Sequence, residues 1–144
     1  MATSEETCVF CKIIAGEIPA DKVYEDENFI GFLDISPRVL GHTLVIPKKH
    51  ARWVYEVENF AQYWEAVLRI TRGMQIALRP KYVNYFTYGS IPHAHVHVLP
   101  RSTPPSVEIP MDLEIVPPQL PKESFTSEEM EQIAAKIREG VESI

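Results

Sequence analysis

The chain has 144 residues, of which 45% are hydrophobic and 24% charged, and its formal net charge is −6. This length suits one domain with its own core, and the composition is that of a folded protein. The negative charge argues against broad binding to a nucleic-acid backbone, which needs clustered Lys and Arg. We therefore expect a single domain over residues 1–144 and no nucleic-acid partner.

The N-terminal residues and the hydropathy of the chain indicate its cellular compartment. The sequence contains no run of about 18 apolar residues, the length that a membrane span needs. The first six residues are polar and acidic and do not resemble a secretory signal. We expect a cytoplasmic protein with no membrane partner. In that reducing compartment Cys8 and Cys11 need a role other than a structural disulfide.

The first half of the chain alternates between the two kinds of regular structure. Apolar residues at helical spacing predict helices, and short β-branched or aromatic runs between turn residues predict strands. The predicted elements are a short helix over 8–16, strands over 23–26, 28–35 and 41–47, and a long helix over 57–78 that Pro80 ends.

The second half predicts two more strands and a last helix. The strands fall at 82–88 and 91–100, and a proline-rich loop follows over 102–125. Thr126 or Ser127 can cap a helix over 126–142, with Ile133, Ile137 and Val141 on one face. Strands that follow one another with few crossovers indicate an α+β fold, in which an antiparallel sheet packs against the long helix and the C-terminal helix.

Three histidines at alternate positions form the strongest motif. Side chains alternate across a strand, so His93, His95 and His97 should share one face, roughly 6.5–7 Å apart. Ala94, Val96 and Val98 would then enter the core. All five histidines fall in two places, this run and the pair His42 and His50 that flank the predicted 41–47 strand, so packing of the strands together should gather them.

Three interpretations of this motif are open. It could be a row of exposed polar residues, although Ser, Thr and Lys fill such positions more often. It could be a metal site, in which three imidazoles hold a catalytic zinc ion as in carbonic anhydrase. It could also supply a nucleophile, because a neutral imidazole attacks phosphorus when its other nitrogen donates to a fixed acceptor, such as a main-chain carbonyl.

The spacing Cys8-x-x-Cys11 also allows several interpretations. The two residues could be buried apolar side chains near a helix start. A redox pair would normally lie beside a thioredoxin-like βαβ pattern, which this sequence lacks. The pair could instead be half of a tetrahedral zinc site, whose other two ligands would have to be histidines.

Four segments in order resemble the histidine triad (HIT) nucleotide-binding family, in its bacterial form with a CxxC pair. They are residues 9–20 (VFCKIIAGEIPA), 32–37 (FLDISP), 41–50 (GHTLVIPKKH) and the His93–His97 run, and the resemblance covers roughly residues 8–101. It implies a HIT-like fold, a homodimer, and an enzyme that cleaves at the α-phosphate of purine nucleotides. Substrates of this class are nucleoside phosphoramidates and dinucleoside polyphosphates.

The resemblance also assigns roles to individual residues. It makes His95 the nucleophile that forms a nucleotidyl-histidine, and it makes His97 the residue that holds or protonates the bridging group. His42 closes the network, and Ser90 lies near the phosphates and the leaving group. The carboxylate of Asp34 would accept from both ribose hydroxyls. The implied nucleotide site comprises Phe10, Ile13, Phe32, Asp34, Ile35, Asn84, Ser90, His95 and His97.

The same resemblance assigns the metal and the dimer contact. It implies a structural zinc ion held by Cys8, Cys11, His50 and His93. Family members usually pair across the long helix and a strand, which here would place Tyr63 or Trp64 at the contact. Two other functions remain open: a zinc hydrolase with the histidines as catalytic ligands, and a dimeric nucleotide-binding module with little turnover.

The chain departs from the family pattern just before the histidine run. The usual glycine-rich Gly-Gln segment is replaced by residues 85–92 (YFTYGSIP), which are about two residues shorter. The bulky Tyr85, Phe86 and Tyr88 are expected either to narrow the entrance of the site or to alternate into the core.

Overall fold

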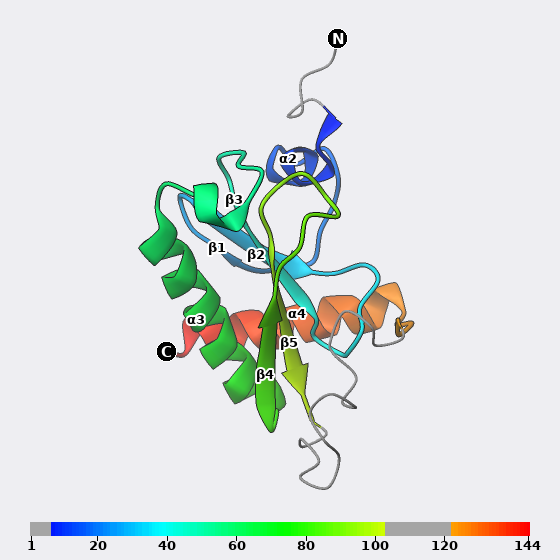
Figure 1. The fold of residues 1–144 in the computed structure, drawn as a ribbon. Helices are drawn as coiled ribbons and strands as arrows, with labels where there is room; N and C mark the ends of the chain where they lie inside the picture. The colour runs from blue at the N-terminus through cyan, green and yellow to red at the C-terminus, as the bar shows by residue number, and fades with distance from the viewer. Residues whose placement is uncertain (1–6, 103–121) are drawn as a thin grey trace, which may run out of the picture.

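A computed structural model describes residues 7–102 and 122–144 (Figure 1). Most of the predicted proline-rich loop lies outside these residues. The elements confirm an α+β fold. In chain order they are α2 (Val9–Ile14), β1 (Lys22–Glu25), β2 (Phe29–Leu33), β3 (Thr43–Pro47), the 3₁₀ turn η1 (Val54–Glu56), α3 (Phe60–Leu78), β4 (Tyr82–Phe86), β5 (Val96–Arg101) and α4 (Ser127–Glu142).

The five strands form one sheet in the order β1-β2-β3-β5-β4 (Figure 1). Every neighbouring pair is antiparallel, as the sequence predicts. The pairing of β3 with β5 joins segments far apart in the chain, with Leu44 opposite His97. This register places the strand that His42 and His50 flank directly beside the histidine run.

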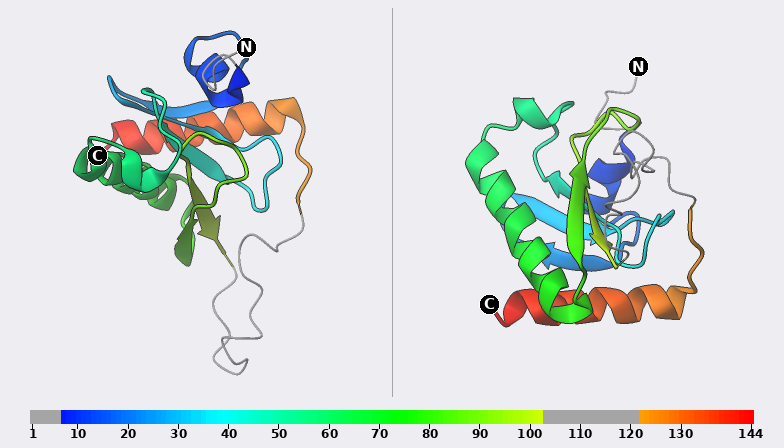
Figure 2. Two further views of the ribbon diagram at one scale, coloured as in Figure 1. Left: turned by 45° about the horizontal axis from the view of Figure 1, so that its top comes forward. Right: turned by 60° about the horizontal axis from the view of Figure 1, so that its bottom comes forward.

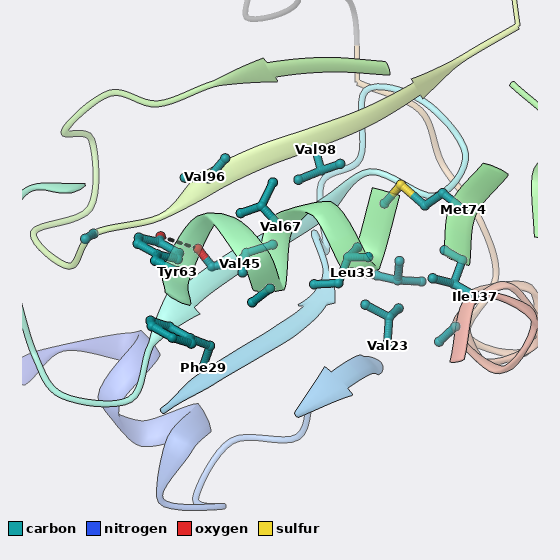
Figure 3. Packing of buried hydrophobic residues seen from close by; sticks show 14 of the residues in the cluster. Val23, Phe29, Leu33, Val45, Tyr63, Val67, Met74, Val96, Val98 and Ile137 are labelled. Carbon is teal, nitrogen blue, oxygen red and sulfur yellow. Dashed lines mark hydrogen bonds between the residues drawn. The ribbon is translucent and has the colours of Figure 1, made fainter. Parts of the chain in front are cut away.

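Side-chain alternation divides the core between the two faces of the sheet. The helices α3 and α4 cover one face, and the short α2 lies on the other (Figures 1 and 2). On the first face Val45, Val96 and Val98 pack against the long helices (Figure 3). On the second face Phe32 and Leu44 pack against Phe10 and its neighbours in α2. The site described below lies on this second face.

The long helix α3 starts at Phe60, three residues later than predicted, and a separate 3₁₀ turn, Val54–Glu56, precedes it. Its Tyr63 is fully buried and donates a hydrogen bond to the carbonyl oxygen of Val45 at 2.6 Å (Figure 3). The expectation that Tyr63 lies at a dimer contact is therefore wrong, since the core of a single chain already encloses it. Trp64 is half-buried and remains available.

The C-terminal helix α4 is capped as predicted and crosses α3 closely. Thr126 accepts from the backbone N–H of Glu129, and the Glu129 carboxylate accepts from the backbone N–H of Thr126. At the crossing, a β-carbon on Gly140 would overlap the backbone of Gly73. Glycine at this point lets the two helix backbones touch.

The final strand is shorter than predicted. It begins at Val96, so His93 and His95 precede the ladder, and β4 ends at Phe86. Pro92 has no N–H to donate, and the N–H of Ala94 donates to the carbonyl of Ala51 instead of to a neighbouring strand. None of the helices in the described parts of the chain is long and apolar enough to span a membrane.

Candidate active site

The three histidines of the run are enclosed by the fold. His93, His95 and His97 are 0%, 2% and 6% exposed, which excludes a row of solvent-facing polar residues. Alternation persists although only His97 belongs to β5: Ala94, Val96 and Val98 all enter the core under α3. Burying three imidazoles requires polar partners, and those partners determine what each ring can do.

A main-chain carbonyl fixes the tautomer of His95. Its Nδ1 lies 2.7 Å from the carbonyl oxygen of His93. A carbonyl only accepts, so Nδ1 carries the proton and donates it. Burial lowers the pKa of His95, although the bond to His93 opposes that shift. The neutral ring therefore has its lone pair on Nε2, as the sequence argument predicts for a nucleophile.

A second chain of hydrogen bonds fixes His42 and His97. The backbone N–H of Arg38 donates to His42 Nδ1 at 3.1 Å, so the proton of the neutral His42 ring lies on Nε2. That nitrogen is 2.8 Å from His97 Nδ1, which must accept. Burial lowers the pKa of His42 to about 4 and that of His97 to about 3, so both rings are neutral near pH 7.

These hydrogen bonds leave His97 with a buried N–H donor that has no partner among the described residues. Because His97 Nδ1 accepts, its proton lies on Nε2. Among the described residues His97 Nε2 has no hydrogen-bond partner. A buried N–H without a partner costs about 1–3 kcal/mol. The site thus pairs a lone pair on His95 with a free N–H on His97, and their ring centroids are 5.0 Å apart.

These two rings lie at a cavity of about 300 Å³ on the α2 face of the sheet. One part of the lining is apolar and comes from α2, β2 and β3. Another part is polar and can bind hydroxyls and phosphate. The apolar residues include Phe10, Ile13, Phe32 and Leu44, and the polar ones include Asp34, Ser90, His95 and His97.

Asp34 is held at the end of β2 with one oxygen already engaged. Its Oδ1 accepts from the backbone N–H of Ser36 at 2.8 Å, and its Oδ2 lies 3.6 Å from His42 Nε2. The adjacent Ile35 is 89% exposed and lines the cavity. A carboxylate in a fixed turn with a partly accessible oxygen can accept from a ligand hydroxyl.

Two aromatic residues that precede the histidine run stack on the ring of His97. Phe86 stacks on its ring with centroids 4.2 Å apart, and the Tyr88 ring is nearly parallel at 5.4 Å. Tyr88 also lines the cavity. Neither ring enters the α3 core, whereas the Tyr85 hydroxyl reaches Thr71 at 2.6 Å. The sequence predicted that bulky side chains in this segment lie near the site, but it did not indicate that they stack on His97.

One predicted site residue lies elsewhere. Asn84 pairs with Leu99 in the ladder between β4 and β5, and its Oδ1 accepts from Arg101 at 2.8 Å. It is not among the residues that line the cavity. We therefore drop Asn84 from the nucleotide site.

A separate cluster near the start of α2 combines Cys8, Cys11, His50 and His93. The distance from Cys8 Sγ to His93 Nδ1 is 3.2 Å, and that from Cys11 Sγ to His50 Nδ1 is also 3.2 Å. The four potential ligand atoms lie within 4.8 Å of one another. His93 Nε2 donates to the Pro47 carbonyl at 2.8 Å, which leaves Nδ1 unprotonated toward the sulfurs.

This donor set fits a tetrahedral metal ion. Zinc bonds to sulfur and nitrogen of about 2.0–2.3 Å place neighbouring ligand atoms roughly 3.3–3.8 Å apart, close to the spacings observed. A histidine ligand whose other nitrogen donates to a carbonyl is also the usual arrangement around such an ion. Four of the five histidines therefore form two pairs, since His42 joins His97 while His50 joins His93. His42 and His50 reach different partners because they lie beyond opposite ends of β3.

Comparison with known proteins agrees with this geometry. The HIT domain model matches residues 15–103. The protein hit of Bacillus subtilis is 47% identical over 104 residues, which cover 67% of this chain and 72% of that protein. Adenosine 5'-monophosphoramidase hnt1 of Schizosaccharomyces pombe is 35% identical over 103 residues, covering 66% of this chain and 74% of that protein.

Solved structures show the same fold over nearly the whole chain. A hypothetical histidine triad nucleotide-binding protein from Sulfolobus tokodaii superposes with a TM-score of 0.78 at 32% identity, covering 94% of this chain and 93% of that one. A zinc-bound histidine triad family protein from Mycobacterium smegmatis gives a TM-score of 0.74 at 29% identity, covering 96% of both chains. The chain belongs to the HIT domain family.

Proposed function

We propose that this chain is a hydrolase or transferase that cleaves at the α-phosphate of purine nucleotides, with nucleoside phosphoramidates as its first candidate substrates. The observation that carries the proposal is the fixed tautomer of His95, whose Nε2 lone pair lies at a nucleotide-sized cavity. The S. pombe relative named adenosine 5'-monophosphoramidase supports the same class of substrate.

In this proposal the apolar lining of the cavity binds the purine base, and the polar lining binds the ribose and the phosphate. Phe10 and Phe32, whose ring centroids are 5.6 Å apart, form with Ile13 an apolar wall for the purine base. Asp34 Oδ2 accepts from the ribose hydroxyls, and Ile35 covers the ribose at the mouth. The α-phosphate then lies between His95 and His97, near Ser90.

Cleavage proceeds in two displacements, which divide a difficult hydrolysis into easier steps. The lone pair of His95 Nε2 attacks the α-phosphorus, a nitrogen–phosphorus bond forms, and the bond to the leaving group breaks. The leaving nitrogen or oxygen, hydrogen-bonded to His97 Nε2–H, takes its proton from a water molecule. The hydroxide left by that water attacks the same phosphorus, the nitrogen–phosphorus bond to His95 breaks, and the nucleoside monophosphate is released with all three histidines neutral.

The four-residue cluster holds a structural zinc ion in this proposal. Cys8 and Cys11 from the start of α2 and His50 and His93 from the sheet would fill all four positions, so no site remains for water or substrate. The ion would tie α2 to the sheet. Since Phe10 lies between the two cysteines and contacts His95, this tie also fixes the base-binding wall.

The division of the histidines disfavours a catalytic zinc hydrolase. The three alternating imidazoles do not belong to one cluster, since His93 joins the cysteines, whereas His97 joins Asp34 and His42 in a second group whose ligand atoms are close enough for a metal ion. In that second group His42 Nε2 and His97 Nδ1 lie 2.8 Å apart, so they share a hydrogen bond and neither nitrogen has a lone pair directed at an ion. Among the described residues His95 belongs to neither group. Loss of turnover on chelation in a protein that stays folded and still binds nucleotide would favour the zinc hydrolase instead.

We also propose that the chain is a single HIT-like domain over residues 1–144, with its core at about 8–101, and that it forms a cytoplasmic homodimer. The outer side of α3 exposes Phe60 and Leu68, each at 47%, next to the half-buried Trp64. Trp64 packs beside Tyr85 of the edge strand β4, so these residues form one continuous apolar surface.

The experiment is a single-turnover reaction that traps the intermediate. Wild type and His95→Gly are mixed with adenosine 5'-monophosphoramidate or a diadenosine polyphosphate, quenched in base and analysed by peptide mass spectrometry. We expect an AMP adduct on His95 in wild type, no adduct in the variant, and a fall in kcat of several orders of magnitude. Equal turnover by both proteins overturns the proposal, and binding without turnover would favour a nucleotide-binding module.

A further inference from the structure

A short loop between β4 and β5 forms part of the cavity. It supplies Tyr88, Ser90 and Ile91 to the lining. Tyr88 lies against the reacting end of the site, because it stacks on His97, and Ser90 lines the same cavity as His95 and His97. What holds this loop therefore affects where its side chains meet the phosphate.

Arg52, which lies two residues after His50, holds the centre of the loop. Its Nη2 donates to the carbonyl oxygen of Gly89 at 3.2 Å. Its guanidinium lies over the Trp53 ring, 4.0 Å from the ring centroid. This stacking fixes the plane of the guanidinium and hence the direction of its N–H groups.

Gly89 lies close against the same Trp53 ring. A β-carbon at position 89 would come within 2.5 Å of Cη2 and Cζ3 of Trp53 and 3.1 Å of Arg52 Nη1. The backbone of Gly89 therefore meets the ring as closely as any residue can. Arg52, Trp53 and Gly89 together form an arrangement that we call the clamp.

The bonding of Arg52 is not that of a residue placed for stability alone. The neighbouring Lys48 and Lys49 pair with Glu25 and Glu58. Arg52 has no carboxylate within ion-pair distance among the described residues, and its buried Nη1 has no partner there. A buried N–H of this kind costs free energy, which a purely structural contact would avoid.

We propose that Arg52 is a positioning residue for the reaction, which acts by clamping Gly89 so that Ser90 and Tyr88 face the phosphate beside His95 and His97. The inference rests on the proposed function and deepens it. Arg52 itself does not line the cavity. Its loss should therefore slow the chemistry more than it weakens binding of the nucleotide.

The test compares Arg52→Met with Lys49→Met, which removes a nearby cation whose ammonium pairs with Glu58. With adenosine 5'-monophosphoramidate, we expect kcat to fall about 10- to 100-fold in Arg52→Met, while KM and the Kd for AMP stay within about threefold. Arg52→Lys keeps a donor and should recover part of kcat. Lys49→Met should match wild type.

Gly89→Ala tests the clamp from its other side. The added methyl group pushes the loop off Trp53 without touching Arg52's charge, so it should reproduce the loss of kcat. Equal kcat in wild type, Arg52→Met and Gly89→Ala overturns the inference. A parallel loss in kcat and AMP binding overturns it too, since that would indicate general disruption of the fold.

A spectroscopic measurement separates this inference from the proposed function. The chain contains two tryptophans, so in a Trp64→Phe background Trp53 is the sole indole. Arg52→Met should increase acrylamide quenching of Trp53, because the covering guanidinium is lost and the loop moves. Failure of wild type to hydrolyse any nucleotide refutes the proposed function, whereas unchanged quenching refutes the clamp.

Discussion

His42 Nε2 lies 2.8 Å from His97 Nδ1, and this bond decides the protonation of both rings. The backbone N–H of Arg38 occupies the other nitrogen of His42, so the proton between the rings belongs to His42. The ring proton of His97 therefore lies on Nε2, which is buried without a hydrogen-bond partner among the described residues. A main-chain amide therefore determines which atom of His97 can meet a substrate.

Loss of the hydrogen bond between His42 and His97 should impair catalysis more than it impairs nucleotide binding. His42→Leu removes the donor to His97, so the His97 ring loses its fixed tautomer, and we expect kcat to fall about 10- to 100-fold with a smaller change in KM. His42→Gln keeps an N–H donor and should lose less. Steady-state kinetics with adenosine 5'-monophosphoramidate measure both. Equal losses in the two variants would show that size rather than hydrogen bonding matters at position 42.

Asp34 should act through ribose binding. Asp34→Asn keeps the acceptor for the Ser36 N–H but loses the charge, and we expect KM to rise roughly 10- to 100-fold, which corresponds to about 1.5–3 kcal/mol. Asp26→Asn is the matched control, because Asp26 also accepts backbone N–H groups in a turn but does not line the cavity. A fall in kcat with unchanged KM in Asp34→Asn would contradict this role.

Metal removal should affect nucleotide binding through α2. Cys8→Ser and Cys11→Ser should reduce bound zinc from about one ion per chain to almost none. The melting temperature should fall, and the Kd for AMP should rise because Phe10 is no longer tied to the sheet. Plasma emission spectrometry, thermal melts and calorimetry measure the three effects. Wild-type protein that carries no zinc, or variants that bind AMP normally, would refute the coupling.

Buried neutral histidines should make the fold sensitive to acid. The pKa values of His42 and His97 fall from 6.5 to about 4 and about 3, with burial as the largest cause. The unfolded chain therefore binds more protons below pH 6.5, so the free energy of unfolding is fully retained above that pH and decreases as the pH drops toward 4. Urea unfolding at pH 7.5, 6, 5 and 4 measures the loss. His42→Gln/His97→Gln should show a flatter dependence, and an equally steep one would refute the assignment.

Particular residues show which features of the structure could be predicted from the sequence. Alternation placed Val96 and Val98 in the core and His97 on the opposite side, because a strand permits nothing else. The Nδ1 bond of His95 to a main-chain carbonyl was likewise predictable, since extended backbone offers carbonyls to its own side chains. Local pattern did not reveal that Ala94 would donate to Ala51 and so delay the start of β5, because that partner comes from 43 residues earlier in the chain.

The sequence by itself determined the class of fold, the family and eight of the nine residues expected at the nucleotide site, which line the cavity, because these depend on periodicity and on motifs that keep their order along the chain. The family resemblance already implied how the histidines divide. Only the tertiary structure decided which nitrogen carries the proton in these three rings, since the bonds from His42 to His97 and from His93 to the carbonyl of Pro47 join distant segments. It also decided that Asn84 lies away from the cavity and that Tyr63 belongs to the core. Contacts between distant segments depend on strand register and on the packing of α3 and α4, which no local spacing encodes.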